Sequence, residues 1–176
     1  FVGANSGINV TTGDFNIMLG VAAGANGGDV DKTIFIGTQA GAGQTMTADA
    51  DGTIAIGHYA GHNIKTGQYN TAIGYEALYT ATELDKNTAI GYQALKVASG
   101  SAGTGENTAV GYQAGVAMTT GTGHTLIGSS AGASLTGGVR NTLVGSGAGD
   151  ALVNTNDNVA VGHNALGGAS STEYCV

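Results

Sequence analysis

One pentapeptide of the chain has the form of the nucleophile turn of a serine hydrolase. Gly128-Ser129-Ser130-Ala131-Gly132 matches G-x-S-x-G, whose central serine attacks a carbonyl after a histidine and an acid activate it. That turn must join a strand to a helix, and it needs both partners nearby. Ser130, however, takes the place that Gln93 and Gln113 hold in two other copies of a sequence repeat. We therefore assign the match to the repeat and expect the protein not to be an enzyme.

Three acidic or amide-rich turns could supply oxygen ligands to a hard cation such as Ca²⁺. They are Asp29-Val30-Asp31, Asp49-Ala50-Asp51 and Asn154-Thr155-Asn156-Asp157. The alternative is that these residues make local hydrogen bonds within turns, where Asp and Asn are favoured. The sequence lacks the Gly-Gly-x-Gly-x-Asp pattern of calcium-binding β-rolls. We expect no cofactor, with a structural calcium ion as the minor alternative.

The four histidines do not have the spacing of a metal site. His58 and His163 occupy equivalent places in repeats that lie far apart, and His124 replaces an asparagine of the repeat. His58 and His62 are close in sequence, but two histidines alone do not define a zinc site. We expect no metal-binding or catalytic histidine.

Other residues recur at fixed places and would form ladders if the repeats stack. Tyr75, Tyr92 and Tyr112 predict an aromatic ladder that either supports the fold or offers a flat surface to a glycan. Residues at the same place in successive repeats form a column. A column of asparagines predicts a ladder of side-chain amides, at Asn70, Asn87, Asn107, Asn141 and Asn158. A column of threonines raises the alternative of an ice-binding surface, at Thr71, Thr88, Thr108, Thr125 and Thr142. Against that alternative, only one threonine per strand repeats, and we expect it to share its face with the core aliphatics.

A repeat centred on Asn87-Thr88-Ala89-Ile90-Gly91-Tyr92-Gln93-Ala94-Leu95 must position all of these residues. Near-copies begin at Asn70 and Asn107. The repeat glycine returns at intervals of 17 or 20 residues along the chain, and such self-similarity is typical of solenoid architectures. The repeat glycines are Gly3, Gly20, Gly37, Gly57, Gly74, Gly91, Gly111, Gly128, Gly145 and Gly162.

Two columns flank the repeat glycine. An aliphatic residue precedes it in every copy, and an alanine, or Ser6 in the first copy, follows three residues later. The residue types of Thr88-Ala89-Ile90-Gly91-Tyr92 predict a strand, with alternate side chains on opposite faces. We expect the aliphatic column to form the core and the alternate column, which includes Ala89, to face a partner chain. Apolar residues seven positions after the glycine predict a second short strand, at Val10, Ile64, Met118, Leu135 and Leu152.

The two longer repeats carry their three extra residues at the same turn. The insertions fall within Ala48-Asp49-Ala50-Asp51-Gly52 and Gly100-Ser101-Ala102-Gly103-Thr104-Gly105. Because solenoids accommodate insertions in loops, we expect both segments to bulge from one edge of the coil stack.

Composition excludes several classes of function. The 176 residues include 33 glycines and no proline, only 10% are charged, and the net charge is −7. The five basic residues form no stripe, so we do not expect nucleic-acid binding. No apolar run approaches the roughly 20 residues of a membrane span, and the single Cys175 cannot form an internal disulfide. Phe1-Val2-Gly3 begins in the middle of a repeat, which suggests a fragment of a longer protein.

The block Asn-Thr-Ala-Ile-Gly-Tyr-Gln-Ala-Leu resembles repeats of bacteriophage tail-fibre proteins and related surface fibres. More distantly, Thr-Ala-Ile-Gly is similar to the head repeat of trimeric autotransporter adhesins, whose unit is shorter. The resemblance covers about residues 1–166 and is sharpest over 70–115. It implies a left-handed parallel β-roll in which three chains pack side by side.

We expect an all-β parallel solenoid, or β-roll, of about ten coils of 17–20 residues, left-handed and trimeric. Residues 1–166 would form one domain, and 167–176 a tail or the start of a following segment. The expected function is that of a structural fibre segment on a virion or cell surface, holding or forming a surface that attaches to a host receptor or glycan. The alternative is a carbohydrate- or surface-binding module that uses the insertions and the tyrosine column.

Overall fold

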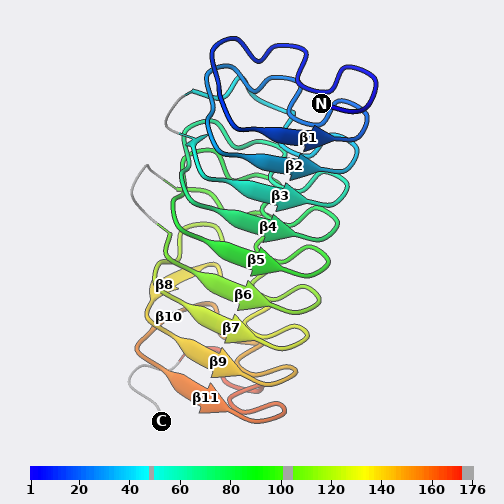
Figure 1. Cartoon of the computed structure of the whole chain (residues 1–176). Helices are drawn as coiled ribbons and strands as arrows, with labels where there is room; N and C mark the ends of the chain where they lie inside the picture. The colour runs from blue at the N-terminus through cyan, green and yellow to red at the C-terminus, as the bar shows by residue number, and fades with distance from the viewer. Residues whose placement is uncertain (48–49, 101–104, 172–176) are drawn as a thin grey trace.

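The chain folds into a stack of coils joined by short parallel strands. The computed structural model describes residues 1–47, 50–100 and 105–171, and its strands follow one another in chain order from the N-terminal to the C-terminal end (Figure 1). The smaller of two sheets pairs β8 (Gly137–Val139) with β10 (Asn154–Asn156). The main sheet consists of β1 (Ile17–Leu19), β2 (Ile34–Ile36), β3 (Ile54–Ile56), β4 (Thr71–Ile73), β5 (Thr88–Ile90), β6 (Thr108–Val110), β7 (Thr125–Ile127), β9 (Thr142–Val144) and β11 (Val159–Val161).

Each strand of the main sheet pairs in parallel and in register with the next, so equivalent residues lie opposite one another. Thr71 lies opposite Thr88, and Thr88 opposite Thr108, although 17 residues separate the first pair and 20 the second. The nine strands correspond to about eight turns of an all-β parallel solenoid, which confirms the predicted fold class. Residues 48–49 and 101–104 of the predicted insertions lie outside the described residues. Within the described residues, no helix is long and apolar enough to cross a membrane.

The strands turn the opposite face inward from the one predicted. Ala89, at the centre of β5, is fully buried, whereas Ile90 beside it is only partly buried. The central residue is also the buried one in every other strand of the main sheet. The prediction that the aliphatic column forms the core is therefore wrong, because each coil turns the central side chain of its strand inward, where it packs with the alanine that follows the repeat glycine by three residues and with apolar side chains further along the coil. The aliphatic and threonine columns share the outward face.

Paired substitutions keep the volume of this interior nearly constant from coil to coil. Ala89 is followed six residues later by the buried Leu95. Met18, a larger side chain, is followed at the same distance by Gly24, where a Cβ would lie only 2.4 Å from Met18 Sδ. These two places share one space, and close packing leaves room there for one large side chain but not for two. The same exchange pairs Ala72 with Leu78, Phe35 with Gly41, Leu126 with Gly132 and Leu143 with Gly149. Where both residues are small, as at Ala55 and Gly61, the side chain of Ile64 fills the space.

The coils turn through left-handed backbone at fixed places. The repeat glycines have φ between 129° and 142°, and a Cβ on Gly91 would lie 2.3 Å from the carbonyl oxygen of Gly111 in the next coil. Two and four residues later the backbone is left-handed again, with φ of 56° at Gln93 and 49° at Leu95. At the repeat glycine itself, only a residue without a Cβ can combine a φ of 129–142° with so close an approach of two backbones. The predicted role of this glycine is confirmed.

The predicted second strand lies elsewhere in the coil. Ile64, Met118, Leu135 and Leu152 are buried as core residues, but they belong to no strand, and Val10 makes only an isolated parallel bridge to Gly28. Paired backbone follows Leu135 and Leu152 instead, in β8 and β10. The left-handed residue three positions before this column bends the chain there, and such a bend is incompatible with a regular extended strand.

Replacing repeat glycines tests the close packing of the coils. Gly91→Ala should lower the free energy of unfolding by about 1–3 kcal/mol more than Gly162→Ala, because its Cβ would overlap the neighbouring carbonyl group. Gly162 is the matched control, since its φ is 131° but its Cβ would meet no atom closer than 4.0 Å. Chemical denaturation followed by circular dichroism measures both losses. Equal losses would show that the φ angle alone requires glycine.

Candidate functional site

An aromatic ladder lies on the surface, formed by the residue that follows the repeat glycine. The rings of Tyr75 and Tyr92 are stacked with centroids 5.3 Å apart, and those of Tyr92 and Tyr112 lie 5.2 Å apart. His58 stacks on Tyr75 at 5.6 Å and extends the ladder by one coil. The predicted stacking of these tyrosines is confirmed.

Stacking decides which parts of the tyrosines are accessible. Tyr75 lies between His58 and Tyr92, and Tyr92 lies between Tyr75 and Tyr112, so both ring faces of each are covered. Both residues are 42% exposed. Tyr112 is stacked on one face only and is 53% exposed. A broad glycan surface along the ladder would need open ring faces, and only Tyr112 among the three offers one.

A second aromatic group lies beside the ladder and was not predicted. Tyr59 contacts His58 edge to face at 4.1 Å, and His62 stacks on Tyr79 at 5.2 Å. Burial lowers the pKa of His62, and Asn63 Oδ1, 3.1 Å from its Nδ1, opposes that shift. Tyr59 takes the place that Gln93 holds two residues after the repeat glycine, and His62 and Tyr79 lie five residues after it, but neither place is regularly aromatic in the sequence. The rings of His58 and His62 are both engaged with aromatic neighbours.

A polar ladder runs parallel to the tyrosines, one residue further along each coil. Gln113 Nε2 donates to Gln93 Oε1 at 2.9 Å, and Gln93 Nε2 donates to Glu76 Oε2 at 2.8 Å. Lys96 Nζ lies 2.8 Å from the same Glu76 oxygen. The bonds from Lys96 and Gln93 lower the pKa of the Glu76 carboxyl group. The recurrence of Gln or Glu two residues after the repeat glycine was the signal available in the sequence.

Ser130 lies in the same column, in the coil after Gln113. Its φ of 58° matches that of the other residues in this place, and its backbone N–H donates to the carbonyl oxygen of Tyr112 at 2.8 Å. In the part of the chain that the structure describes, its hydroxyl group makes no hydrogen bond to a histidine or a carboxylate. The G-x-S-x-G match is thus a piece of the coil.

The acidic turns use their oxygens within the protein. Hydroxyl groups of Thr11 and Thr12 donate to Asp29 Oδ1, the second at 2.8 Å, and these bonds lower the pKa of Asp29. Asp31 Oδ1 accepts the backbone N–H of Asp14 at 2.6 Å, and Asp51 Oδ1 accepts that of Asp31 at 2.7 Å. No group of three possible metal ligands occurs among the described residues, from which Asp49 is missing.

The last of the predicted turns is also engaged. Asp157 pairs with Arg140 through two bonds, of 2.6 and 2.8 Å, and the guanidinium group lowers the pKa of Asp157. Asn156 Oδ1 accepts the backbone N–H of Val139 at 2.9 Å. The oxygens of these turns are thus used in hydrogen bonds between neighbouring coils, since the partners lie 17 residues apart, and not in the local bonds within a turn that the sequence left open as the alternative.

The predicted amide ladder is present and lies inside the stack. Asn87 Oδ1 accepts both the backbone N–H and the side-chain amide of Asn107, each at 3.1 Å. Asn107 Nδ2 also donates across the coil to the carbonyl oxygen of Gly121 at 2.9 Å. Both asparagines are 1% exposed, so these bonds satisfy polar groups that would otherwise be costly to bury.

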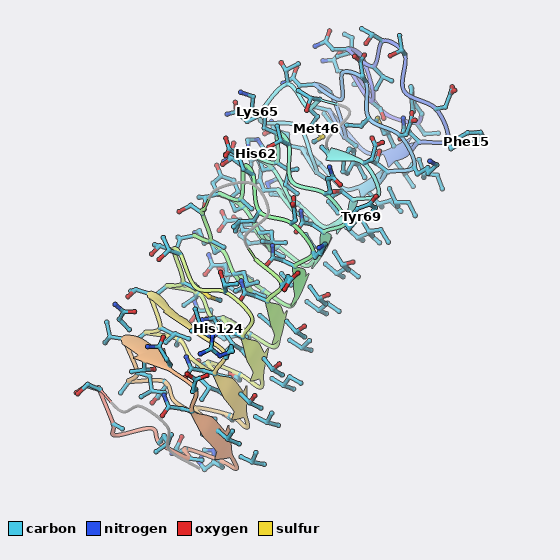
Figure 2. The ribbon with its side chains drawn as sticks, turned by 90° about the vertical axis from the view of Figure 1, so that its left-hand side faces the viewer. Phe15, Met46, His62, Lys65, Tyr69 and His124 are labelled. Carbon is cyan, nitrogen blue, oxygen red and sulfur yellow. The ribbon has the colours of Figure 1, made fainter. Side chains whose placement is uncertain are left out.

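His124 replaces asparagine in this ladder without breaking it. Its Nδ1 accepts the backbone N–H of Asn141 at 3.1 Å, and its Nε2 donates to the carbonyl oxygen of Gly138 at the same distance. The two ring nitrogens thus take over the roles of the amide oxygen and nitrogen, which requires the neutral ring. The side chain lies within the coil stack (Figure 2). Burial lowers the pKa of His124 from 6.5 to about 4.

A shallow cavity of about 510 Å³ lies near the N-terminal end. It is lined by Asn9, Thr11, Gly28, Asp29, Thr45, Met46 and Thr47. Its polar groups are already bonded in part, since Asn9 Nδ2 donates to Asn26 Oδ1 at 3.0 Å and Thr11 donates to Asp29. The cavity therefore offers little that is free for chemistry.

No family model, no curated protein and no solved structure matches the chain.

Acid should weaken the fold through His124. Its pKa is lower in the folded chain, about 4, than the ordinary 6.5, so the unfolded chain binds the extra proton between these values. The stabilising effect of the neutral ring is complete above pH 6.5 and should fall by about 3 kcal/mol as the pH drops to 4. His124→Asn should remove this part of the pH dependence, measured by urea denaturation at a series of pH values.

The exposed His163 supplies the control for this measurement. His163→Asn should leave the decline between pH 6.5 and 4 unchanged. If His124→Asn and the unaltered protein lost stability in parallel over this range, the assigned role of His124 would be wrong.

Proposed function

We propose that this protein is a non-enzymatic structural segment of a surface fibre, such as a viral tail fibre or a cell-surface adhesin. In this proposal the solenoid has ten left-handed coils over residues 1–166, and three copies pack side by side. The fibre stands on a virion or outside a cell, and it holds or forms the surface that meets a host receptor or glycan.

The observation that carries the proposal is the outward face of the main sheet. Leu19 is 44% exposed and Ile127 is 39% exposed, although both belong to a column that is aliphatic in every coil. Side chains project outward from the strands along the whole sheet (Figure 2). Nine strands about 4.8 Å apart extend this face over about 40 Å. An apolar strip of that length is larger than most monomeric proteins leave in water, and such strips mark interaction surfaces.

A second copy of the chain is the occupant that fits this strip best. Parallel, in-register coils give each chain the same linear row of aliphatic and threonine side chains at the same rise. The rows of two or three copies can therefore pack against one another along their full length. A partner of unrelated fold would lack side chains at this spacing. The strip lacks charged side chains in all nine strands, so packing it against itself buries no unpaired charge.

The coil stack suits a mechanical role. Backbone bonds join each coil to the next at many points, including 2.7 Å from Gly91 N to Ile73 O and 2.8 Å from Gln93 N to Tyr75 O. Stretching or bending the rod would break several of these bonds in the same coil. The segment can therefore hold whatever it carries at a set distance.

The native mass of the purified chain tests this proposal. Light scattering should give about three times 17.1 kDa, with a circular dichroism spectrum typical of β-structure. Ile90→Lys should shift the mass to that of a monomer, because it places a charge at the centre of the proposed interface. Ser134→Lys is the matched control, since Ser134 is exposed and lies outside the main sheet. A monomeric unaltered chain would contradict the trimeric fibre.

One observation favours a second candidate, an ice-binding solenoid. Thr71, Thr88, Thr108, Thr125 and Thr142 lie in register on the outward face, contrary to the expected placement among core aliphatics. If this is the function, the chain is monomeric, keeps that face open to water and shows thermal hysteresis. Thr108→Lys would then abolish the hysteresis, while Ser134→Lys would not. A trimer without hysteresis excludes this candidate and leaves the fibre proposal intact.

A further inference from the structure

Two side-chain ladders end at the same coil of the stack. Tyr112 is the last ring of the tyrosine ladder, and Gln113 is the last amide of the polar ladder beside it. The next coil carries Ser129 and Ser130 at these two places, and Ser129 is exposed. The coil after that carries the exposed Ser146 in the tyrosine column. Replacing two large side chains by serines leaves a step on the surface at this point.

The step exposes one aromatic face. Tyr92 covers one side of the Tyr112 ring, with the two planes 7° apart, and only the small Ser129 follows on the other side. The greater exposure of Tyr112, 53% against 42% for Tyr92, agrees with one uncovered face. The next coil lies about 4.8 Å further along, so a ring-shaped ligand above Ser129 would lie at stacking distance from Tyr112.

Polar side chains lie in the tyrosine and glutamine columns of this coil and the next two. Gln113 uses its amide nitrogen to reach Gln93, and among the described residues its carbonyl oxygen has no recorded donor, so it can accept a hydrogen bond. The hydroxyl groups of Ser129, Ser130 and Ser146 can each donate and accept. An exposed ring face with hydrogen-bonding groups nearby can hold a ligand that is apolar on one face and polar at its edge.

We propose that the open face of Tyr112, with Gln113 and Ser129, binds the pyranose ring of a neutral saccharide. A pyranose has an apolar face of C–H groups that stacks on an aromatic ring, and hydroxyl groups at its edge that match the amide and serine groups. A plain aromatic ligand would leave those polar groups without partners. The net charge of −7 disfavours acidic glycans and nucleic acids.

This site replaces the broad tyrosine surface that the sequence predicted with a single ring at the end of the ladder. It depends on the stacked coils and not on the fibre role, so a failed mass test would not remove it. In a trimer the three copies would act together and strengthen a weak single contact.

Saturation-transfer NMR on the full chain tests the site. The probes are the methyl β-pyranosides of galactose, glucose and N-acetylglucosamine, and at least one should receive saturation at its C–H face. Tyr112→Ala should weaken binding by about five- to tenfold, and Tyr112→Phe should retain it, because stacking depends on the ring. Tyr69→Ala is the control: Tyr69 is 60% exposed and belongs to neither ladder.

Ser129→Tyr provides a test that does not depend on removing a ring. The new tyrosine would continue the ladder and cover the open face of Tyr112, so binding should be lost while the circular dichroism spectrum and thermal stability are kept. The proposal is overturned if no probe binds, if binding survives Ser129→Tyr, or if Tyr69→Ala weakens it as much as Tyr112→Ala. Binding of N-acetyltyrosine amide in place of the sugars would also overturn it, and would indicate a protein partner.

Discussion

The structure depends on one constraint, the in-register stacking of coils through parallel backbone hydrogen bonds. Each coil repeats the last at a rise of about 4.8 Å, so every residue must tolerate its counterpart directly above and below. The repeat glycine shows the constraint at its most severe, since a Cβ on Gly74 would lie 2.4 Å from the carbonyl oxygen of Gly91. Coils of 17 and 20 residues meet the same requirement, because the longer coils keep the strand in place and add residues elsewhere.

The narrow interior follows from this stacking. The centre of the strand and the place six residues later share one space, so a large side chain at one goes with a small residue at the other, as Ala89 with Leu95 and Met18 with Gly24 show. Further apolar side chains, such as Leu135 and Leu152, fill the rest of the interior. Most of the buried polar residues that the structure describes belong to one ladder, in which Asn107 and its replacement His124 bond in the same way. Among the described residues, only two buried side-chain polar atoms lack a partner, Asp150 Oδ1 and Thr155 Oγ1.

Stacking also shapes the surface, because any property of one coil is multiplied along the rod. An outward Ile or Val becomes an apolar strip, which favours a partner of the same period. Where tyrosines occupy successive coils, each ring covers the faces of its neighbours, so the rings inside the ladder offer no open face to a ligand. Chemical variety therefore arises where a column is interrupted, as between Tyr112 and Ser129. Irregular positions in the repeat carry more functional information than regular ones.

The parallel solenoid, its repeat glycines, the amide ladder and the tyrosine stack could all be predicted from the sequence, because each depends only on which residues recur at a fixed interval. The period of two in Thr88-Ala89-Ile90 defines two faces of a strand, but it does not say which of them turns inward. Hydrophobicity favoured Ile90 as the buried residue, but the structure buries Ala89 instead. Left-handed residues such as Gln93 and Leu95 close the coil on one face of the strand, so only the side chains of that face lie in the interior. The same left-handed turns excluded the second strand expected at Met118 and left the threonine column, partly buried, on the outward face. These outcomes depend on backbone angles and on the volume left inside a closed coil, which only the tertiary structure determines.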